Sequence, residues 1–259
     1  MIREHIDQMN QVIRLGAKPS RIISLVPSQT EFLHFLGLEQ EVIGITKFCI
    51  HPKEWFDGKQ RVGGTKDVKL DLVRNLSPDF VIANKEENTQ SDVAELQKIA
   101  PVWISDVNTK DQAIEMMRSL AIIFEREELV EELISEITLG LRPFENCSRF
   151  NYLYFMWKDP FFTVGPDTFI HNWLGEFGGM NVQPTSRYPE YHFSTNDQPD
   201  VVFISTEPFP FNESHIPFFQ TKFPNSQIII IDGEMASWYG SRMKDATTYF
   251  ANLLAPLNL

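Results

Sequence analysis

Residues Glu127–Glu145 read EELVEELISEITLGLRPFE, and this stretch decides how the rest of the chain is organised. Its apolar residues recur every three to four positions, and four glutamates lie in its first two turns, where the helix dipole favours carboxylates. The stretch therefore predicts an amphipathic helix of roughly 30 Å, at about 1.5 Å per residue. A helix of this length at mid-chain either joins two halves or covers one face of a single α/β domain. The helix alone leaves both interpretations open.

Short β-branched runs alternate with helical segments on the N-terminal side of this helix. Such alternation is typical of βαβ units and of a largely parallel sheet. The strands are predicted over residues 21–26, 41–46, 80–83 and 101–105. The helices are predicted over residues 30–36, 91–99 and 110–124.

The pattern starts again after the long helix, and the two halves share details of sequence. Strands are predicted over 152–156, 201–205 and 227–231, and a helix over 168–174. The segment Ser77-Pro-Asp-Phe-Val-Ile-Ala83 is echoed by Gln198-Pro-Asp-Val-Val-Phe-Ile204. Thr30-Glu-Phe-Leu-His-Phe-Leu-Gly37 is echoed by Thr168-Phe-Ile-His-Asn-Trp-Leu-Gly175. Two echoes in the same order, on either side of a helix, favour two similar lobes.

We therefore expect an α/β fold of two similar lobes, with mainly parallel sheets, joined by one long rigid helix. The expected N-terminal lobe covers residues 1–125, the connecting helix 126–147 and the C-terminal lobe 148–259. A chain of 259 residues is long enough for two lobes of this size.

Composition excludes several classes of protein. A net charge of −12 argues against nucleic acid and anionic membranes as partners. No run of eighteen apolar residues is present, so no membrane insertion is expected. The charged N-terminus does not resemble a signal peptide, although a mature exported chain would look the same. The compartment, periplasmic or cytoplasmic, is thus left open. Two cysteines do not make a disulfide framework, and a reducing compartment is the simpler interpretation.

The candidate site follows from the sheet, because ligands bind beyond the carboxyl ends of parallel strands. The loops after the predicted strands mix aromatic, acidic and basic side chains, as concave ligand sites do. The candidate ligand-binding residues from these loops are Cys49, His51, Lys66, Lys85, Glu86, Trp157, Glu207, Trp238, Tyr239 and Arg242. Phe209 and Phe211 are in the same loops, but packing within the lobe is the better interpretation for both.

Cys49 and His51 also permit two other kinds of chemistry. A thiolate and an imidazole two residues apart can share a soft metal ion, and Glu86 or Glu87 could complete its ligands. Cys49 with a histidine and an acid also permits nucleophilic catalysis. Both patterns are weak, because no second motif with zinc-site spacing is present. Gly63-Gly64 has neither the spacing of a P-loop nor that of a dinucleotide fingerprint.

Several segments of the chain resemble one family of proteins. Five segments of the N-terminal half occur in the order seen in substrate-binding proteins of ABC importers. They are Arg21-Ile-Ile-Ser-Leu-Val-Pro-Ser-Gln-Thr-Glu31, Val42-Ile-Gly-Ile45, Arg61-Val-Gly63, Leu70-Asp-Leu-Val73 and Ser77-Pro-Asp-Phe-Val-Ile82. The resemblance is to the helical-backbone metal receptors, which take up cobalamin and ferric siderophores. It is weaker in the C-terminal half, where Tyr188-Pro-Glu190, Pro199-Asp200 and Ser237-Trp-Tyr239 carry it.

The resemblance implies a function and further site residues. It implies that the chain holds a metal chelate in an interlobe cleft and delivers it to an ABC permease. Phe48 and Trp238-Tyr239 match the positions of aromatic residues that contact cobalamin. Asp71 matches an acidic residue that docks to permease arginines, and Glu190 is the candidate for the second. Two candidate ligand-binding positions depart from the cobalamin binders: Thr65 replaces a tryptophan and Ser237 an aspartate.

The leading hypothesis is a non-catalytic, monomeric solute-binding protein for cobalamin, a ferric siderophore or haem, with no cofactor or metal ion of its own. The alternative is a cytosolic enzyme, or a cofactor- or metal-handling protein, that uses Cys49 and His51 on the same fold. A third possibility is a pair of lobes retained only as an interaction module, against which the charged loops argue.

Overall fold

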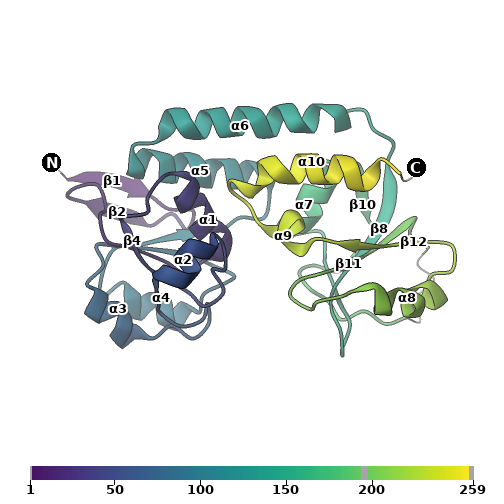
Figure 1. Cartoon of the computed structure of the whole chain (residues 1–259), viewed down its shortest axis with the longest axis horizontal. Coiled ribbons are helices and arrows are strands. Elements are labelled where there is room, and N and C mark those ends of the chain that lie inside the picture. The colour runs from purple at the N-terminus through teal and green to yellow at the C-terminus, as the bar shows by residue number, and fades with distance from the viewer. Residues whose placement is uncertain (1, 194–197, 257–259) are drawn as a thin grey trace. The chain divides into compact units, whose positions relative to one another are not determined.

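The computed structural model describes residues 2–193 and 198–256, and it divides the chain into two compact units. The N-terminal unit comprises Met1–Val107, Asp111–Ser135 and Tyr239–Arg242. The C-terminal unit comprises Asn108–Lys110, Glu136–Trp238 and Met243–Leu259. Each unit contains one main sheet with helices (Figure 1). The predicted two-lobed α/β fold is thus confirmed, while the lobe boundaries at residues 125 and 147 stay a prediction.

The N-terminal unit is built on a five-stranded parallel sheet of order β5-β4-β3-β6-β7. Its strands are β3 (Ile22–Ser24), β4 (Val42–Ile45), β5 (Gln60–Arg61), β6 (Phe80–Asn84) and β7 (Val102–Ser105). Its helices are α1 (Pro27–Phe35), α2 (Lys53–Gly58), α3 (Leu70–Leu76), α4 (Gln90–Leu96) and α5 (Lys110–Phe124), of which α5 starts at a residue of the other unit.

Both faces of this sheet are buried, as expected for parallel strands that read as continuous apolar runs. On one face Ile23, Val81 and Val102 pack with apolar residues of α3 and α4. On the other face the Phe80 ring meets the Phe124 ring of α5 edge-to-face, with 5.9 Å between centroids. Phe80 and Val81 therefore point to opposite helix layers, in keeping with the two-residue period of a strand.

An antiparallel hairpin precedes the sheet, formed by β1 (Arg3–Ile6) and β2 (Val12–Leu15). The sequence analysis did not predict it. Its turn contains Asp7, whose carboxylate accepts from the amides of Met9 and Gln11 at 2.9 and 2.8 Å and from that of Ile104, in β7, at 3.2 Å. The hairpin is thereby fastened to β7, the edge strand of the sheet.

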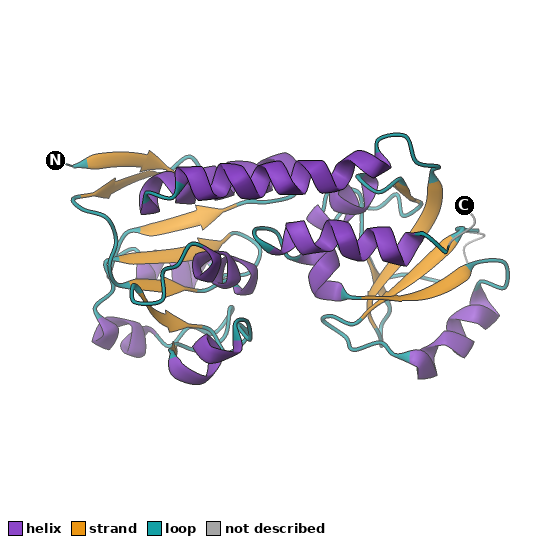
Figure 2. Ribbon diagram, turned by 45° about the horizontal axis from the view of Figure 1, so that its top comes forward, coloured by secondary structure: helices purple, strands orange, loops and turns teal. Residues whose placement is uncertain are grey.

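The C-terminal unit has a sheet of order β10-β8-β11-β12, with β9 paired antiparallel to β8. Its strands are β8 (Phe150–Trp157), β9 (Phe162–Thr163), β10 (Gly179–Asn181), β11 (Val201–Ser205) and β12 (Gln227–Ile231). Its helices are α7 (Phe169–Gly175), α8 (Ile216–Lys222), α9 (Gly233–Ser237) and α10 (Arg242–Leu254), with short 3-10 turns at Arg142–Phe144 and Glu213–His215. Figure 2 shows these strands in orange and the helices in purple.

The repeated Pro-Asp has the same structural role in both units. The Asp79 carboxylate accepts from the Arg21 amide at 2.8 Å, and the Asp200 carboxylate from the Asn151 amide at 2.7 Å. Asp79 precedes β6 and ties the start of that strand to the start of β3. Asp200 precedes β11 and ties the start of that strand to β8. The sequence echo therefore reflects a shared hydrogen bond.

The long predicted helix is α6 (Glu127–Leu141), followed by the 3-10 turn at Arg142–Phe144. Pro143 explains the change, because proline has no amide hydrogen with which to continue the helix. Residues up to Ser135 belong to the N-terminal unit and residues from Glu136 to the C-terminal unit. The long helix predicted over Glu127–Glu145 is confirmed, and it ends four residues earlier, at Leu141.

Candidate functional site

The loops at the carboxyl edge of the N-terminal sheet contain several of the predicted site residues. This edge is formed by the residues that follow β3 to β7, and one further segment completes it. Residues Tyr239–Arg242, here called the clasp, return from the end of the chain and belong to the same compact unit. The edge thus combines segments that lie more than 200 positions apart in sequence, as in the Gln29–Tyr239 contact.

A buried network of amides and hydroxyls holds the clasp on this edge. The Asn84 side-chain amide donates to the Tyr239 hydroxyl and to Ser105 Oγ, both at 3.0 Å. Gln29 Nε2 also donates to Ser105 Oγ, and lies 3.4 Å from the Tyr239 oxygen. Burial raises the pKa of Tyr239 to about 12, although its hydrogen bonds act in the opposite direction. The hydroxyl is therefore a neutral structural group at physiological pH.

Two further features fix the clasp. Arg242 Nε and Nη2 donate to the two carboxylate oxygens of Glu31 at 2.9 and 2.6 Å. Gly240 has a φ of +110°, a conformation that favours glycine, and a Cβ there would lie 3.2 Å from Phe32 Cβ. Tyr239 and Arg242 were predicted to contact a ligand directly. The structure engages both polar groups inside the N-terminal unit, where they hold the clasp, and direct ligand contact by either residue stays a prediction.

Asn84 also shapes the loop after β6. Its Oδ1 accepts from the amides of Glu86 and Glu87 at 2.8 and 3.0 Å. Asn88 then closes the loop, because its Oδ1 accepts from the Asn84 amide at 2.8 Å and its amide donates to the Thr65 carbonyl at 2.8 Å. The side chains of Lys85, Glu86 and Glu87 remain exposed on this fixed backbone. Lys85 pairs with Asp106 at 2.6 Å.

The loop after β4 exposes an aromatic side chain. Phe48 is 50% exposed, and the Lys47 ammonium lies 5.0 Å from its ring centroid. The backbone beneath it is fixed, because the Lys47 amide donates to the Gly63 carbonyl at 2.8 Å and the Cys49 amide to the Thr46 carbonyl at 3.2 Å. A fixed loop that keeps a phenyl ring in solvent is suited to stack on an apolar ligand surface.

Cys49 lies buried beneath the loop that carries Phe48. Its side chain is fully buried, and its sulfur lies 3.1 Å from the hydroxyl oxygens of both Thr30 and Thr46. Burial raises the pKa of the Cys49 thiol, with smaller opposing effects from the two threonines. A nucleophile needs a lowered pKa and access to substrate. Burial and the raised pKa argue against a ligand-contacting or reactive Cys49, which stays a prediction, and the contacts of the thiol anchor the loop that carries Phe48.

The carboxyl edge of the C-terminal sheet has its own exposed aromatic residue. Trp157, at the end of β8, is 40% exposed and meets the Phe209 ring edge-to-face at 5.9 Å between centroids. Phe209 in turn lies 4.7 Å from the buried Phe211 ring. This placement agrees with the packing interpretation of both phenylalanines. Glu207 follows β11 on the same edge, and its amide donates to Ser205 Oγ at 3.2 Å.

The remaining predicted ligand contacts differ in their access to solvent. Trp238 and Thr65 are each only 8% exposed. Ser237 Oγ donates to the Gly233 carbonyl at 2.7 Å within α9. Lys66 is exposed, whereas His51 is half-buried. Direct ligand contacts by these five residues stay a prediction.

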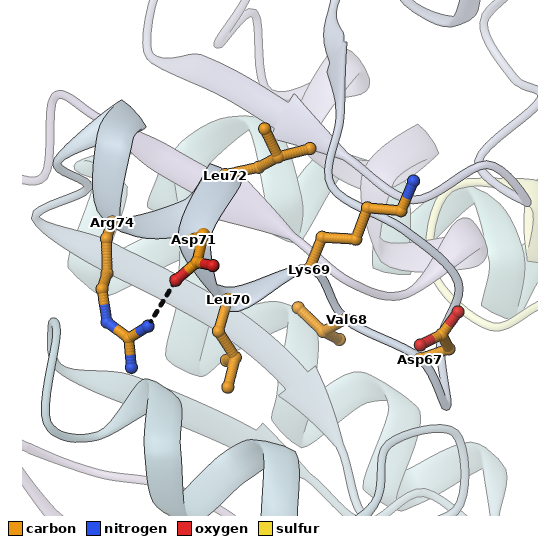
Figure 3. A pocket seen from close by; sticks show the side chains of 7 residues that line it. All are labelled: Asp67, Val68, Lys69, Leu70, Asp71, Leu72 and Arg74. Atoms are coloured by element: carbon orange, nitrogen blue, oxygen red, sulfur yellow. Dashed lines mark hydrogen bonds and ion pairs between the residues drawn. The ribbon is translucent and has the colours of Figure 1, made fainter.

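The two predicted docking acids are both exposed. Figure 3 shows Asp71 in the first turn of α3, beside a shallow pocket lined by residues 67–72 and 74. Its side chain is 95% exposed and accepts from Arg74 Nη1 at 2.8 Å. Glu190 is exposed in the C-terminal unit, and its backbone forms an isolated antiparallel β-bridge with that of Phe162.

Sequence reasoning missed the residues that make the buried network: Gln29, Asn84, Asn88 and Ser105. A signal was present, because Asn84 and Ser105 are polar residues that end apolar strands. Among residues 2–193 and 198–256, no group of three histidine, cysteine or acidic side chains is placed to hold a metal ion. Over the same residues, no helix is long and apolar enough to cross a membrane.

Comparison with known proteins places the chain in a class. Residues 22–143 match the model of a periplasmic binding protein family. The chain is 27% identical over 188 residues to the uncharacterized ABC transporter substrate-binding lipoprotein YvrC of Bacillus subtilis. That match covers 68% of this chain and 59% of the lipoprotein. The resemblance predicted from sequence is confirmed: the chain is related to the substrate-binding proteins of ABC transporters.

Two further proteins that the chain resembles, one in sequence and one in fold, are named by their ligands. One is the vitamin B12-binding protein of Vibrio campbellii, 25% identical over 198 residues that cover 71% of this chain and 70% of the relative. The other is the crystal structure of the petrobactin-binding protein YclQ of Bacillus subtilis, with a TM-score of 0.80 and 19% identity. That alignment covers 100% of this chain and 99% of YclQ, and shows that the two share a fold.

Proposed function

We propose that this protein is a solute-binding protein that holds a metal chelate, such as cobalamin, a ferric siderophore or haem, for an ABC permease. Its similarity to vitamin B12-binding and ABC transporter substrate-binding proteins supports the class. The observation that carries the proposal is the half-exposed Phe48 ring on a hydrogen-bonded loop at the carboxyl edge of a parallel sheet. That edge is where α/β proteins bind ligands, and an exposed ring there provides apolar contact area.

The alternative, an enzyme that uses Cys49 and His51, has less support. The Cys49 thiol is buried, and its pKa is raised rather than lowered. We therefore propose no catalytic role, and we propose that the protein acts as a monomer without a cofactor of its own.

The experiment is native mass spectrometry with an absorption spectrum on protein purified from its source, followed by a thermal-shift panel of cobalamin, ferric chelates, haem and bare divalent ions. A ligand at about a hundred times its Kd adds roughly 2.7 kcal/mol of stability. A chelate that copurifies or stabilises supports the proposal. A response to bare ions alone, or to nothing in the panel, contradicts it.

We also propose that Asp71 contributes to docking on the permease, with Glu190 as the second acidic residue. The support is the exposure of Asp71 at the start of α3, where its charge can meet a cationic partner. Asp71→Ala should leave ligand affinity unchanged and weaken stimulation of the permease ATPase, measured in proteoliposomes. Asp57→Ala, which changes another exposed acid, serves as the control. Equal stimulation by the Asp71 variant and the unmodified protein would refute the docking role.

A further inference from the structure

We infer that the ligand is an electrically neutral or cationic chelate rather than an anionic one. This inference rests on the proposed function and narrows it, because ferric catecholates and haem carry negative charge, whereas cobalamins and ferric hydroxamates are neutral or cationic. The argument comes from the charges on each carboxyl edge, with histidine counted as neutral.

The carboxyl edge of the N-terminal sheet has no excess of positive charge. Its charged side chains lie in the loops after β4 to β7, in α1 and in the clasp. The cationic ones are Lys47, Lys66, Lys69, Lys85 and Arg242. The anionic ones are Glu31, Asp67, Glu86, Glu87 and Asp106. Five charges of each sign cancel, so this edge attracts an anion no more than a cation at long range.

Two of the five cations are already paired. Both nitrogens of Arg242 that face Glu31 are within 2.9 Å of its carboxylate, and only 11% of the arginine side chain is exposed. Lys85 lies 2.6 Å from Asp106. Among the predicted ligand-binding residues, Arg242 is best suited to bind an anion with two parallel hydrogen bonds. Its Nε and Nη2 groups, however, already donate to the Glu31 carboxylate. Among the strand-end lysines, Lys66 also lies near the Glu87 carboxylate: burial raises the pKa of Glu87, and the charge of Lys66 opposes this rise.

The carboxyl edge of the C-terminal sheet is acidic. The cationic residues in the loops after β8, β10, β11 and β12 are Lys158 and Arg187. Among the described residues, the anionic ones in those loops at this edge are Asp159, Glu190, Glu207 and Asp232, and Glu234 follows in the first turn of α9. Both cations have acidic neighbours, because Lys158 lies 3.9 Å from Asp159 and Arg187 lies 3.9 Å from Asp167.

At the carboxyl edge of either unit, an anionic chelate would therefore meet no excess of positive charge, on a chain of net charge −12. Binding removes ligand charge from water, and this is costly without an opposite charge to compensate. A neutral chelate avoids that cost, and a cationic one gains at the C-terminal edge from Glu207 and its acidic neighbours. Recognition of a neutral chelate would then depend on the exposed ring of the edge that it contacts, Phe48 in the N-terminal unit or Trp157 in the C-terminal unit.

The test is isothermal titration of the whole chain with five probes: cyanocobalamin, neutral ferrichrome, cationic ferrioxamine B, anionic ferric enterobactin and anionic haem. We expect binding by at least one neutral or cationic probe, and affinity for each anionic probe at least about tenfold weaker. Tighter binding of ferric enterobactin or haem would overturn this inference and leave the proposed function intact. Absence of binding to all of these probes would overturn both.

Two charge-removing variants separate specific charge recognition from a structural effect. Glu207→Gln should weaken binding of a cationic probe by about three- to tenfold and change that of a neutral probe by less than about twofold. The matched control is Lys66→Gln, which removes an exposed charge of the other sign. It should leave cation binding unchanged or slightly tighter. If the chain binds only neutral probes, both variants should bind them with unchanged affinity. The inference would be contradicted if the Lys66→Gln variant bound an anionic probe more tightly than the Glu207→Gln variant does.

Discussion

The ion pair between Arg242 and Glu31 allows a quantitative test of how the clasp is held. The donors lie 2.9 and 2.6 Å from the carboxylate oxygens, and the side chains are 11% and 23% exposed. Two unit charges about 4 Å apart attract by roughly 4 kcal/mol at an effective dielectric constant of about 20. Desolvation of both groups offsets part of this attraction. We expect a net coupling of about 1.5–3 kcal/mol, above the ~0.2–1 kcal/mol typical of exposed pairs.

The measurement is a double-mutant cycle with Arg242→Met, Glu31→Gln and the double variant, followed by urea unfolding with coincident circular dichroism and fluorescence transitions. The matched control is the Lys244–Glu136 pair, which has a similar distance of 2.8 Å but side chains 48% and 41% exposed. The control cycle should give about 0.5 kcal/mol or less. If the Arg242–Glu31 coupling is no larger than that of the control pair, the clasp is not held by this interaction.

Three other predictions concern single side chains. Iodoacetamide should label the half-buried Cys147 on the order of 100-fold faster than Cys49, because the Cys49 thiol is buried and its pKa is raised. Peptide mass spectrometry measures the two labelling rates, and equal rates would contradict the role of Cys49 as an anchor. Phe48→Ala should weaken chelate binding by about 1–3 kcal/mol with little change in unfolding free energy. Phe218→Ala, which removes a similarly exposed ring on α8, should leave chelate binding unchanged. Titration calorimetry measures both affinities, and equal losses of affinity would exclude Phe48 as a contact. Tyr239 has its pKa raised from the ordinary value of 10.0 to about 12, so the unfolded chain loses this proton first and stability should fall as pH rises between 10 and about 12. Tyr239→Phe should reduce that fall by up to about 1.4 kcal/mol per pH unit in urea titrations, and an unchanged pH slope would show that the phenol ionises equally in both states.

Most of the fold could be predicted because its strands have a strong local signal. β11 and β12 occur at the predicted residues, and α5 has the predicted bounds of Lys110 and Phe124. In β11 and β12, four apolar residues with high β-propensity follow one another without interruption. The N-terminal hairpin lacks such a run, because Arg3 and Arg14 interrupt it, and its stability depends on a carboxylate that reaches a distant strand.

The site was less predictable, for a physical reason. The sequence places Tyr239 and Arg242 after a strand, where exposure to a ligand is a reasonable expectation. Their hydrogen-bond partners, however, lie about two hundred positions earlier, at Gln29, Glu31 and Asn84. Local pattern contains no information on such a pairing. Burial of Cys49 was missed in the same way, because Thr30 covers its sulfur from another element.

The clasp has a consequence for the order in which the chain can fold during synthesis. Residues up to Ser135 leave the ribosome long before Tyr239 is made, yet the N-terminal unit includes both. Until then, the amide of Asn84 and the carboxylate of Glu31 lack the partners that the clasp provides. Closing a loop of this length costs only slightly more entropy than closing a short one, so late docking is thermodynamically acceptable. A nascent or truncated chain that ends before residue 239 would therefore leave the Asn84 amide and the Glu31 carboxylate without these partners, so the N-terminal unit reaches its full set of contacts only after residue 242 has been added.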